Sequence, residues 1–362
     1  MVRWQGSMEG MGMSENFWKG RTVFLTGHTG FKGGWTALWL THLGAKVYGF
    51  SLEPPSSPSF FEKTELESQV FRSVIGDICD LNTLSHELKN SGASVVIHMA
   101  AQSLVRESYS DPVKTYQTNL MGTLNLFEAV RNADSVKAVV NITTDKCYEN
   151  QEWPWAYRES DRLGGYDPYS NSKACVELLT DCYRNSFFKE KNIHLASVRA
   201  GNVIGGGDWA QDRLIPDFFR ALDQGKKLSI RSPLAIRPWQ HVLEPISGYL
   251  KVAELLVCEG PRFAAAWNFG PEETDAKPVS WIVDKLCSEI ADARWEIDAQ
   301  SVLHEAGRLK LDSSKAKEFL GWAPNWTLDE ALQATISWHL AWKGKENMRD
   351  FSLDQIKAYS GE

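Results

Sequence analysis

The sequence has no apolar run long enough to cross a membrane. Its longest apolar stretches, such as residues 94–101, fall far short of the roughly 20 residues that a spanning helix needs. It also has no basic excess, because 39 Lys and Arg stand against 46 Asp and Glu, for a net charge of −7. A surface that binds duplex nucleic acid needs such an excess. We therefore expect a soluble protein whose partners include neither a membrane nor nucleic acid.

Cysteine patterns that hold metals or disulfides are also missing. The sequence contains no C-x-x-C pair, and its six cysteines are scattered at positions 79, 147, 175, 182, 258 and 287. This predicts free thiols in a reducing cytoplasm and no metal site. Residues 1–16 lack the continuous apolar segment of a secretory signal peptide, and methionines recur at 8, 11 and 13. We interpret this stretch as a disordered leader.

From residue 21 onward, short apolar runs alternate with turns and helical stretches. Residues 22–26 (TVFLT) form a β-branched apolar run, as a buried parallel strand should. Further strands are predicted at 46–50, 74–76, 94–98, 138–143 and 194–199, and helices at 35–43, 119–131 and 169–189. This alternation predicts an α/β fold, with a doubly wound parallel sheet of the Rossmann type.

The pattern changes after about residue 201. Three consecutive glycines at 205–207 and prolines at 216, 233, 238 and 245 separate shorter elements. Helices are predicted at 215–222, 244–257, 279–291 and 328–342. We predict a first domain over residues 17–200 and a second, smaller lobe over 201–362, with some segments crossing between the two around one cleft.

A glycine-rich loop follows the first predicted strand. Its pattern, G-x-x-G-x-x-G, stands directly before a predicted helix. Glycine lets the backbone turn sharply and lets a pyrophosphate approach the free N–H groups at the start of the helix. We therefore predict a dinucleotide-binding domain. The loop residues predicted to bind the cofactor are Gly27, Thr29, Gly30, Phe31, Lys32 and Gly33, with His28 bordering it.

The end of the second predicted strand does not decide between NAD and NADP. An acidic residue there would hold the adenosine ribose of NAD, but the chain has Ser51. No arginine is present to receive the 2′-phosphate of NADP. Ser51 is a candidate cofactor contact, and the choice between the two dinucleotides stays open on this residue alone.

Tyr169 and Lys173 form the pattern Y-x-x-x-K on a predicted helix. Residues four apart share a helix face, so both side chains should reach one cleft. A nearby cation favours the phenolate and should lower the pKa of the tyrosine toward the range of a useful base. Thr144 ends an earlier predicted strand, and its hydroxyl could bind the reacting oxygen beside the tyrosine. Together the three side chains predict a reductase-type catalytic triad.

These motifs resemble those of the extended short-chain dehydrogenase/reductases. The resemblance rests on T-G-x-x-G-F-x-G at the loop and on the triad, and it implies NAD as cofactor. It further implies that the G-D-I segment at 76–78 meets the adenine and that H-M-A-A-Q at 98–102 lines the nicotinamide side. The additional cofactor contacts implied are Asp77, Ile78, Ala100, Ala101, Gln102, Tyr169 and Lys173. Asn119 matches an asparagine that is usually structural in this family.

Asp145 and Lys146 directly follow the triad threonine. A simple dehydrogenase or 4-epimerase needs only hydride transfer and an acid/base tyrosine, so a second ionisable pair suggests a second proton transfer. The nucleotide-sugar 4,6-dehydratases of this family have S/T-D-E here, and this chain has Lys146 in place of the glutamate. The variant T-T-D-K-C-Y, followed by G-G-Y-D-P-Y, resembles the branch that acts on CDP-glucose.

The resemblance implies a reaction in deoxysugar biosynthesis. CDP-glucose would be oxidised at C4, lose water across C5 and C6, and regain hydride at C6 to give a 4-keto-6-deoxy sugar, with NAD regenerated in each turnover. Tyr169, Thr144 and Lys173 would handle the proton of the 4-hydroxyl. Lys146 would remove the C5 proton, and Asp145 would protonate the departing 6-hydroxyl.

Several residues after the sixth predicted strand are candidates for the substrate. Arg213 and Arg237 are candidates for a phosphate clamp, because guanidinium forks match phosphate oxygens. Asn202 matches the asparagine that binds substrate pyrophosphate in the family, and Arg308 resembles a late arginine that meets the nucleotide. The base on the sugar cannot be derived from residue types and is taken from the resemblance.

Two other functions are consistent with parts of the sequence. One is a 4-epimerase, or a dehydratase for another nucleotide-sugar, although the Asp145–Lys146 pair argues against the epimerase. The other is a non-catalytic scaffold that binds NAD, although the triad is intact. Apolar positions on helices 119–131 and 169–189 exceed what one core face needs, which predicts a homodimer or homotetramer.

Overall fold

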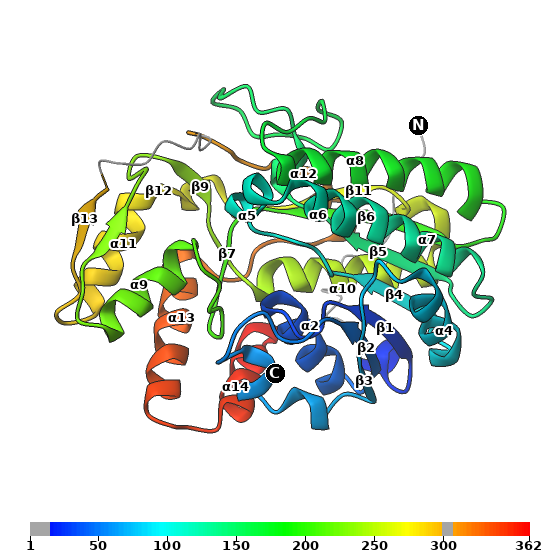
Figure 1. Ribbon diagram of the computed structural model, residues 1–362, viewed down its shortest axis with the longest axis horizontal. Coiled ribbons are helices and arrows are strands. Elements are labelled where there is room, and N and C mark those ends of the chain that lie inside the picture. Colours follow the sequence, from blue (N-terminus) through cyan, green and yellow to red (C-terminus); the bar gives the residue numbers. More distant parts are fainter. Residues whose placement is uncertain (1–14, 299–306) are drawn as a thin grey trace.

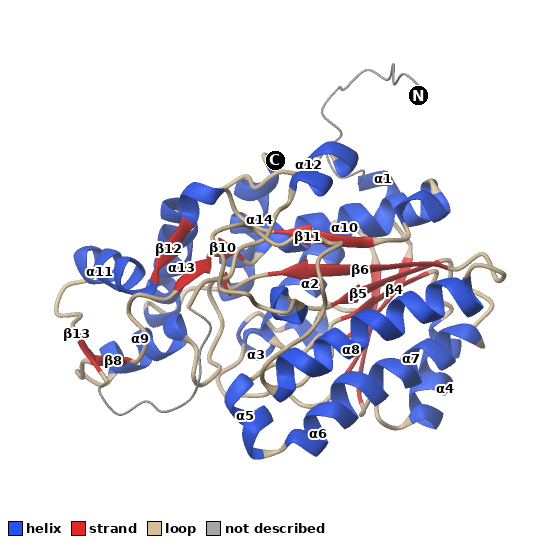
Figure 2. Ribbon diagram, turned by 90° about the horizontal axis from the view of Figure 1, so that it is seen from above, coloured by secondary structure: helices blue, strands red, loops and turns tan. Residues whose placement is uncertain are grey.

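The computed structural model describes residues 15–298 and 307–362. Residues 1–14 lie outside this range, so most of the predicted leader does too, while helix α1 (Glu15–Trp18) begins within its last two residues. The chain forms three layers, with a central sheet between two groups of helices, and a smaller lobe beside one edge of this assembly (Figures 1 and 2).

The central sheet has seven parallel strands in the order β11-β6-β5-β4-β1-β2-β3. This confirms the α/β class and the parallel sheet. The strands are β1 (Thr22–Thr26), β2 (Lys46–Ser51), β3 (Arg72–Ile75), β4 (Val95–His98), β5 (Ala138–Ile142), β6 (His194–Ala200) and β11 (Ala266–Phe269). Strands β4, β5 and the inner part of β1 are buried on both faces, which explains their continuous apolar sequences.

Each face of the sheet has its own apolar core. One core contains side chains of the helices α2 (Phe31–His42), α10 (Leu243–Cys258) and α14 (Met348–Ser360). The opposite core contains side chains of α4 (Leu81–Ser91), α7 (Gly122–Arg131) and α8 (Pro168–Tyr183). Figure 2 shows the two groups of helices on either side of the strands.

The smaller lobe is built from short strands and three helices around a separate apolar core. Its helices are α9 (Leu214–Asp223), α11 (Val279–Glu289) and α13 (Leu328–Lys343). Its strands pair two by two, namely β7 (Val203–Ile204) with β10 (Gln240–His241), β9 (Ile236–Pro238) with β12 (Ala276–Pro278), and β8 (Leu228–Ile230) with β13 (Trp295–Ile297). These pairs of two or three residues rely on the helices that cover them.

Short helices and turns connect these elements. They are α3 (Phe60–Lys63), α5 (Val105–Ser110), α6 (Pro112–Tyr116), α12 (Ser314–Leu320), η1 (Leu66–Ser68), η2 (Gln117–Met121), η3 (Asp145–Cys147), η4 (Arg184–Phe188), η5 (Gly260–Phe263) and η6 (Glu273–Asp275). Within the described residues, no helix is both long and apolar enough to cross a bilayer.

The main differences from the predicted elements have local causes. Helix α2 begins at Phe31, four residues before the predicted start, because Gly33 and Gly34 of the glycine cluster lie inside the helix. The predicted helix 169–189 ends as α8 at Tyr183 and continues as a π-helical turn. Strand β11 and helix α10 follow residue 201 in the chain but belong to the sheet and its covering layer.

The parallel sheet places the candidate residues together. Strands β1, β4, β5 and β6 all end at the same edge, so the segments that follow them share one side of the molecule. The smaller lobe stands beside this edge (Figure 1).

Candidate active site

A cleft of about 1260 Å³ lies between the sheet edge and the smaller lobe. Its walls include the glycine loop, the ends of β2, β3, β4, β5 and β6, the start of α8, and residues 200–217 and 228–232 of the lobe. A cleft of this size exceeds the usual volume of a single small-ligand pocket, so it can hold an extended ligand or two ligands together.

The glycine loop forms the floor of the cleft at the start of α2. Gly27 has a φ of +80°, and a Cβ there would lie 2.8 Å from the backbone nitrogen of Ala100. A Cβ on Gly33 would lie 2.0 Å from the carbonyl oxygen of Gly27. Both positions therefore require glycine. Gly30 caps α2 without a side-chain hydrogen bond, so the first N–H groups of the helix remain available to an anionic ligand.

The end of β2 is tied to this loop by hydroxyl groups. The Thr29 hydroxyl lies 2.8 Å from the Ser51 hydroxyl and donates to the carbonyl oxygen of Leu52 at 2.8 Å. Ser51 and Asp77 both line the cleft. Ser51 thus braces the loop at the position where a carboxylate was expected.

His28, which was predicted to border the cofactor, does not line the cleft. Its ring is buried beneath β2, where Nε2 lies 2.7 Å from the hydroxyl of Ser73 and the ring packs edge-on against Phe61. Gly49 in β2 leaves the necessary space, because a Cβ there would lie 2.4 Å from the imidazole. Burial lowers the pKa of His28 to about 4, so the ring is neutral.

Thr144, Tyr169 and Lys173 meet at the centre of the cleft wall. The hydroxyl of Thr144 forms a hydrogen bond with the phenol of Tyr169, and Nζ of Lys173 donates to the carbonyl oxygen of Ile142 at 3.3 Å. Asp167 starts α8 by accepting a hydrogen bond from the backbone nitrogen of Ser170, which fixes the first turn of this helix.

The expected lowering of the Tyr169 pKa is wrong for this structure. Burial raises the pKa of Tyr169 to about 12, and the hydrogen bond with Thr144 and the charge of Arg213 only partly offset it. Lys173 does not appear among the largest influences on the phenol. Burial also lowers the pKa of Lys173 to about 8, opposed by the carboxylate of Glu177. Burial at this wall therefore favours the neutral forms of both groups.

Asp145 and Lys146 lie next to the triad in different positions. Lys146 lines the cleft, and its Nζ lies 3.5 Å from Oδ1 of Asp145 and 3.4 Å from Oδ1 of Asn202. Asp145 is fully buried behind the wall, and its Oδ1 accepts a hydrogen bond of 2.9 Å from Thr144. Among the described residues, Oδ2 of Asp145 has no hydrogen-bond partner. Asp145 thus reaches the cleft through Thr144 and Lys146.

Gln102 and Asn119 have structural contacts. The side chain of Asn119 accepts a hydrogen bond from the backbone nitrogen of Gln102 and donates to the hydroxyl of Ser172 on α8, both at 2.9 Å. Gln102 itself is buried and does not line the cleft, while Ala100 and Ala101 do. Asn119 therefore connects the segment after β4 to the helix that carries Tyr169.

The lobe contributes two of the predicted arginines to the cleft. Arg213 is held by Asp208, with Nη1 2.9 Å from Oδ2, and donates to the hydroxyl of Ser103 across the cleft at 3.0 Å. Arg237 lines the cleft on β9. Arg308 does not line it, although Ile236 beside Arg237 forms a β-bridge with it.

Positive charge gathers at this site. Lys32 is half-buried at the cleft, and the nearby charges of Arg213, Lys173 and Lys146 add to the effect of desolvation in lowering its pKa to about 7. Asp145 is the carboxylate that opposes them. Such a site favours ligands that carry phosphate groups.

Sequence reasoning missed three residues that shape the site. Asp208 fixes Arg213, and the buried Glu177 and Arg199 form an ion pair behind the triad, with Nη2 2.8 Å from Oε2. Glu177 could have been found, because it lies four residues after Lys173 on the same helix face. The partners of Asp208 and Arg199 could not be predicted, because they are brought together by the fold and not by a recognisable spacing in the sequence.

Comparison with known sequences identifies the family. A profile of the family described as GDP-mannose 4,6-dehydratase matches residues 24–335. The chain is 52% identical over 353 residues to a protein of Salmonella typhimurium named CDP-glucose 4,6-dehydratase, covering 96% of this chain and 98% of that one. It is also 29% identical to a dTDP-glucose 4,6-dehydratase of Haemophilus influenzae, over 75% of this chain and 82% of that one.

Solved structures with the same fold include enzymes of two kinds. A dTDP-glucose 4,6-dehydratase of Bacillus anthracis in complex with NAD has a TM-score of 0.73 at 22% identity, covering 88% of this chain and 96% of that one. A UDP-glucose 4-epimerase of Thermotoga maritima has a TM-score of 0.72 at 20% identity, covering 87% and 97%. These likenesses establish the fold, and the profile match establishes the family: the chain belongs to the GDP-mannose 4,6-dehydratase family of nucleotide-sugar enzymes.

Proposed function

We propose that this chain is an NAD-dependent CDP-glucose 4,6-dehydratase, which converts CDP-glucose into CDP-4-dehydro-6-deoxyglucose and water. The observation that carries the proposal is the near full-length relative named for this activity, combined with Lys146 and Asp145 next to the triad. A 4-epimerase of the same fold eliminates no water and needs no such pair. The reaction has no net change in oxidation state, so no external reductant is required.

The glycine loop fits a dinucleotide on structural grounds. Gly27 and Gly33 leave no room for a side chain, and the uncapped start of α2 offers N–H groups to a pyrophosphate. From there the cleft continues past Ser51 and Asp77 on one side, where the adenosine half would lie, and past Ala100 toward Tyr169 on the other. NAD, when bound, supplies the hydride acceptor for C4 and the hydride donor for C6.

Tyr169, Thr144 and Lys173 act on the 4-hydroxyl. Tyr169 accepts its proton as C4 is oxidised, and the Thr144 hydroxyl orients both oxygens. Because burial favours the neutral phenol, the proton must leave Tyr169 before this step, and the positive charge of Arg213 assists that loss. We assign the same part to Lys173, which lies one helical turn from Tyr169 on the same face of α8. The resulting 4-ketone acidifies the hydrogen on C5.

Lys146 and Asp145 carry out the elimination. Nζ of Lys146 removes the C5 proton, and its contacts to Asp145 and Asn202 hold Nζ at the cleft surface. Asp145 supplies the proton that leaves with the 6-hydroxyl as water. Since the Asp145 side chain is buried, this proton passes through the hydroxyl of Thr144, which it contacts. The proton held by Lys146 then returns to C5, and the proton that Tyr169 took from the 4-hydroxyl passes through Thr144 to Asp145, which restores the starting state.

The phosphates and base of the substrate lie against the smaller lobe. Arg213 and Arg237 line the cleft there and present guanidinium groups to the diphosphate, with Asn202 beside them. Arg308 is assigned to the nucleotide from the family resemblance alone, since only its neighbour Leu309 lines the cleft.

We further propose a cytoplasmic homodimer or homotetramer. All six cysteines are free, as in a reducing compartment. Met121 and Leu178, at α7 and on α8, are 47% and 61% exposed, and such apolar side chains on neighbouring helices suit a contact with a second copy.

The direct test is incubation of the purified protein with NAD and, separately, with CDP-, dTDP-, UDP- and GDP-linked glucose. Mass spectrometry should detect loss of one water from CDP-glucose alone, and Tyr169→Phe serves as the matched inactive control. Water loss from another nucleotide only would contradict the CDP assignment. A product of unchanged mass but inverted C4 would contradict dehydration. No reaction despite bound NAD would indicate a scaffold.

A further inference from the structure

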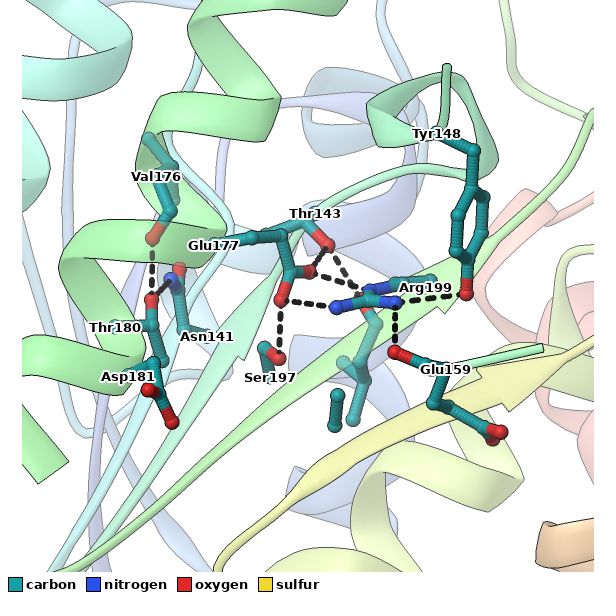
Figure 3. A network of polar contacts seen from close by, with 12 residues as sticks. Asn141, Thr143, Tyr148, Glu159, Val176, Glu177, Thr180, Asp181, Ser197 and Arg199 are labelled. Carbon is teal, nitrogen blue, oxygen red and sulfur yellow. Dashed lines mark hydrogen bonds and ion pairs between the residues drawn. The ribbon is translucent and has the colours of Figure 1, made fainter. Parts of the chain in front are cut away.

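A buried ion pair lies directly behind the triad, between α8 and β6. The carboxylate of Glu177 receives two hydrogen bonds from Arg199, from Nη2 to Oε2 at 2.8 Å and from Nε to Oε1 at 2.9 Å. The hydroxyl of Ser197 also donates to Oε2 at 2.7 Å, and the hydroxyl of Thr143 donates to Oε1. Figure 3 shows these four donors around one carboxylate. Both charged side chains are almost completely buried.

The guanidinium of Arg199 extends this network to the segment after Lys146. Its Nη1 donates to the phenol oxygen of Tyr148 at 2.7 Å and to the carbonyl oxygen of Glu159 at 3.2 Å. Tyr148 in turn donates to Oδ1 of Asn268 in β11 at 2.8 Å. The ion pair is therefore the centre of a network that joins α8, β6, β11 and the chain that follows β5, and Figure 3 shows its part from Glu177 to Tyr148 and Glu159.

Every segment that carries a proposed reacting group is attached to this pair. Thr143 immediately precedes Thr144, and Tyr148 lies two residues after Lys146. Glu177 lies one helical turn after Lys173, and Arg199 lies three residues before Asn202. A small displacement of the pair would therefore move the triad and the elimination residues relative to one another.

A neighbouring contact shows that α8 can be joined to the sheet without charged side chains. One turn further along α8, the Thr180 hydroxyl donates to the carbonyl oxygen of Val176 and accepts a 2.8 Å hydrogen bond from Asn141 of β5. This contact joins β5, the strand that leads into Thr143, to the same helix, and it is buried and neutral (Figure 3). A buried ion pair is seldom more stabilising than an uncharged replacement. The charge on Glu177 therefore calls for a different explanation.

We propose that Glu177 and Arg199 are positioning residues for the dehydratase reaction. They hold the ends of β5 and β6 against α8, and Glu177 supplies the negative charge that keeps Lys173 cationic beside Tyr169. This inference rests on the function proposed above, because it assigns a purpose to the charge of Lys173.

The charges around Lys173 support this role. Burial lowers the pKa of Lys173 to about 8, and the carboxylate of Glu177 is the largest influence that opposes this change. The neighbouring Cys147 thiol is neutral, because burial raises its pKa well above the usual value. The other titratable groups that face Lys173 are His98 from β4, which is neutral, and Lys32 from α2, which repels it. Without Glu177, Lys173 would lose its proton at a lower pH.

Glu177 is itself held ionised. Burial alone would raise the pKa of Glu177, but the charge and hydrogen bonds of Arg199, with those of Ser197 and Thr143, bring it below its usual value. Arg199 therefore keeps Glu177 ionised, and the carboxylate of Glu177 acts on Lys173 as a negative charge.

The test compares variants of this network with a matched neutral control. For each protein, kcat and KM for CDP-glucose are measured between pH 6 and 9.5 together with the thermal unfolding temperature. Glu177→Gln should lower kcat, with little change in KM. It should also shift the alkaline limb of the profile of kcat against pH to lower pH by about one unit or more. Thr143→Val should lower kcat without moving that limb. Thr180→Val, the control on the same helix, should lower only the unfolding temperature.

Two further variants keep the test decisive. If Glu177→Gln does not fold because Arg199 is left unpaired, the charge-free variant Glu177→Gln/Arg199→Met is used in its place. This variant should show the same shift in the alkaline limb of the profile of kcat against pH. Glu177→Asp, which restores the charge, should recover the position of the limb, though not all of kcat. A folded charge-free variant with the kcat and alkaline limb of the wild type would overturn the proposal. Wild-type protein that does not dehydrate CDP-glucose would instead overturn the proposed function.

Discussion

The two walls of the cleft are built in different ways. On the sheet side, the candidate residues follow the ends of sheet strands or, in the case of Tyr169 and Lys173, lie on helix α8, which covers the sheet. Each of these strands is fixed by neighbours in the seven-stranded sheet. On the lobe side, Arg213 precedes a helix at the end of a loop and Arg237 lies on a strand of three residues. The position of Arg213 therefore depends on individual contacts such as its ion pair with Asp208.

The difference suggests a division of labour. Bond making and breaking needs atoms held within a fraction of an ångström, which continuous strands and a covering helix can provide. Binding of an extended nucleotide-sugar tolerates more mobile elements. We therefore expect changes on the sheet side to affect the cofactor or kcat, and changes on the lobe side to affect KM.

The largest effect is expected at the most tightly packed point of the sheet side. Gly33→Ala would place a methyl group 2.0 Å from the carbonyl oxygen of Gly27, so the loop must open. We expect a destabilisation of about 1–3 kcal/mol and a loss of NAD affinity, measured by thermal unfolding with and without NAD. Gly30→Ala is the control, because its methyl group would lie 3.4 Å from the same oxygen. Equal NAD binding by Gly33→Ala and the wild type would refute a rigid loop.

On the lobe side, Arg237→Gln should raise KM for CDP-glucose by about 10- to 100-fold while kcat changes far less. The reason is that charge-assisted hydrogen bonds to phosphate contribute about 1.5–3 kcal/mol. Steady-state kinetics measures both constants, with Arg158→Gln as control, since Arg158 is exposed, pairs with Asp312 and lies outside the cleft. A large fall in kcat at unchanged KM would mean that the lobe takes part in the chemistry.

A smaller effect should appear in the pH dependence of stability. Burial, with the charge of Lys173, lowers the pKa of His98 to about 3, and the ring lies between the hydroxyls of Thr26 and Thr123. Below pH 6.5 the unfolded chain gains a proton at His98 that the folded chain does not take up until about pH 3. The free energy of unfolding should therefore fall with decreasing pH, by about 1.4 kcal/mol per unit from this residue.

Urea denaturation of His98→Gln between pH 6 and 4.5 checks this expectation. The slope of unfolding free energy against pH should be shallower than in the wild type, whereas His86→Gln, at an exposed position on α4, should keep the wild-type slope. Identical slopes for the wild type and His98→Gln would show that the buried ring contributes nothing to acid sensitivity.

Much of the sheet side could be predicted from the sequence. Parallel strands buried on both faces have continuous apolar sequences, and the glycine loop and Y-x-x-x-K stand at fixed positions relative to them. Strand β11 was not predicted, because it follows some 65 residues after β6 in the chain, and only the folded sheet brings the two together. The π-helical turn after α8 likewise has no signal in the apolar pattern.

What could not be predicted for the site is the burial of its side chains and their partners in the folded structure. Spacing correctly placed Thr144, Tyr169 and Lys173 on one wall, but it could not show that burial would raise the pKa of Tyr169. Nor could it show that Asp145 and Gln102 lie behind the wall. On the lobe side, where no regular strand sets the register, Arg213 and Arg237 reach the cleft and Arg308 does not line it.

The most direct test of the account is a single turnover of Lys146→Met with NAD and CDP-glucose. In the proposed mechanism, Tyr169, Thr144 and Lys173 serve the oxidation at C4, and Lys146 removes the C5 proton. The variant should therefore accumulate the absorbance of reduced nicotinamide without loss of water from the sugar. Formation of the 6-deoxy product at the wild-type rate would contradict the role of Lys146 as the base of the elimination.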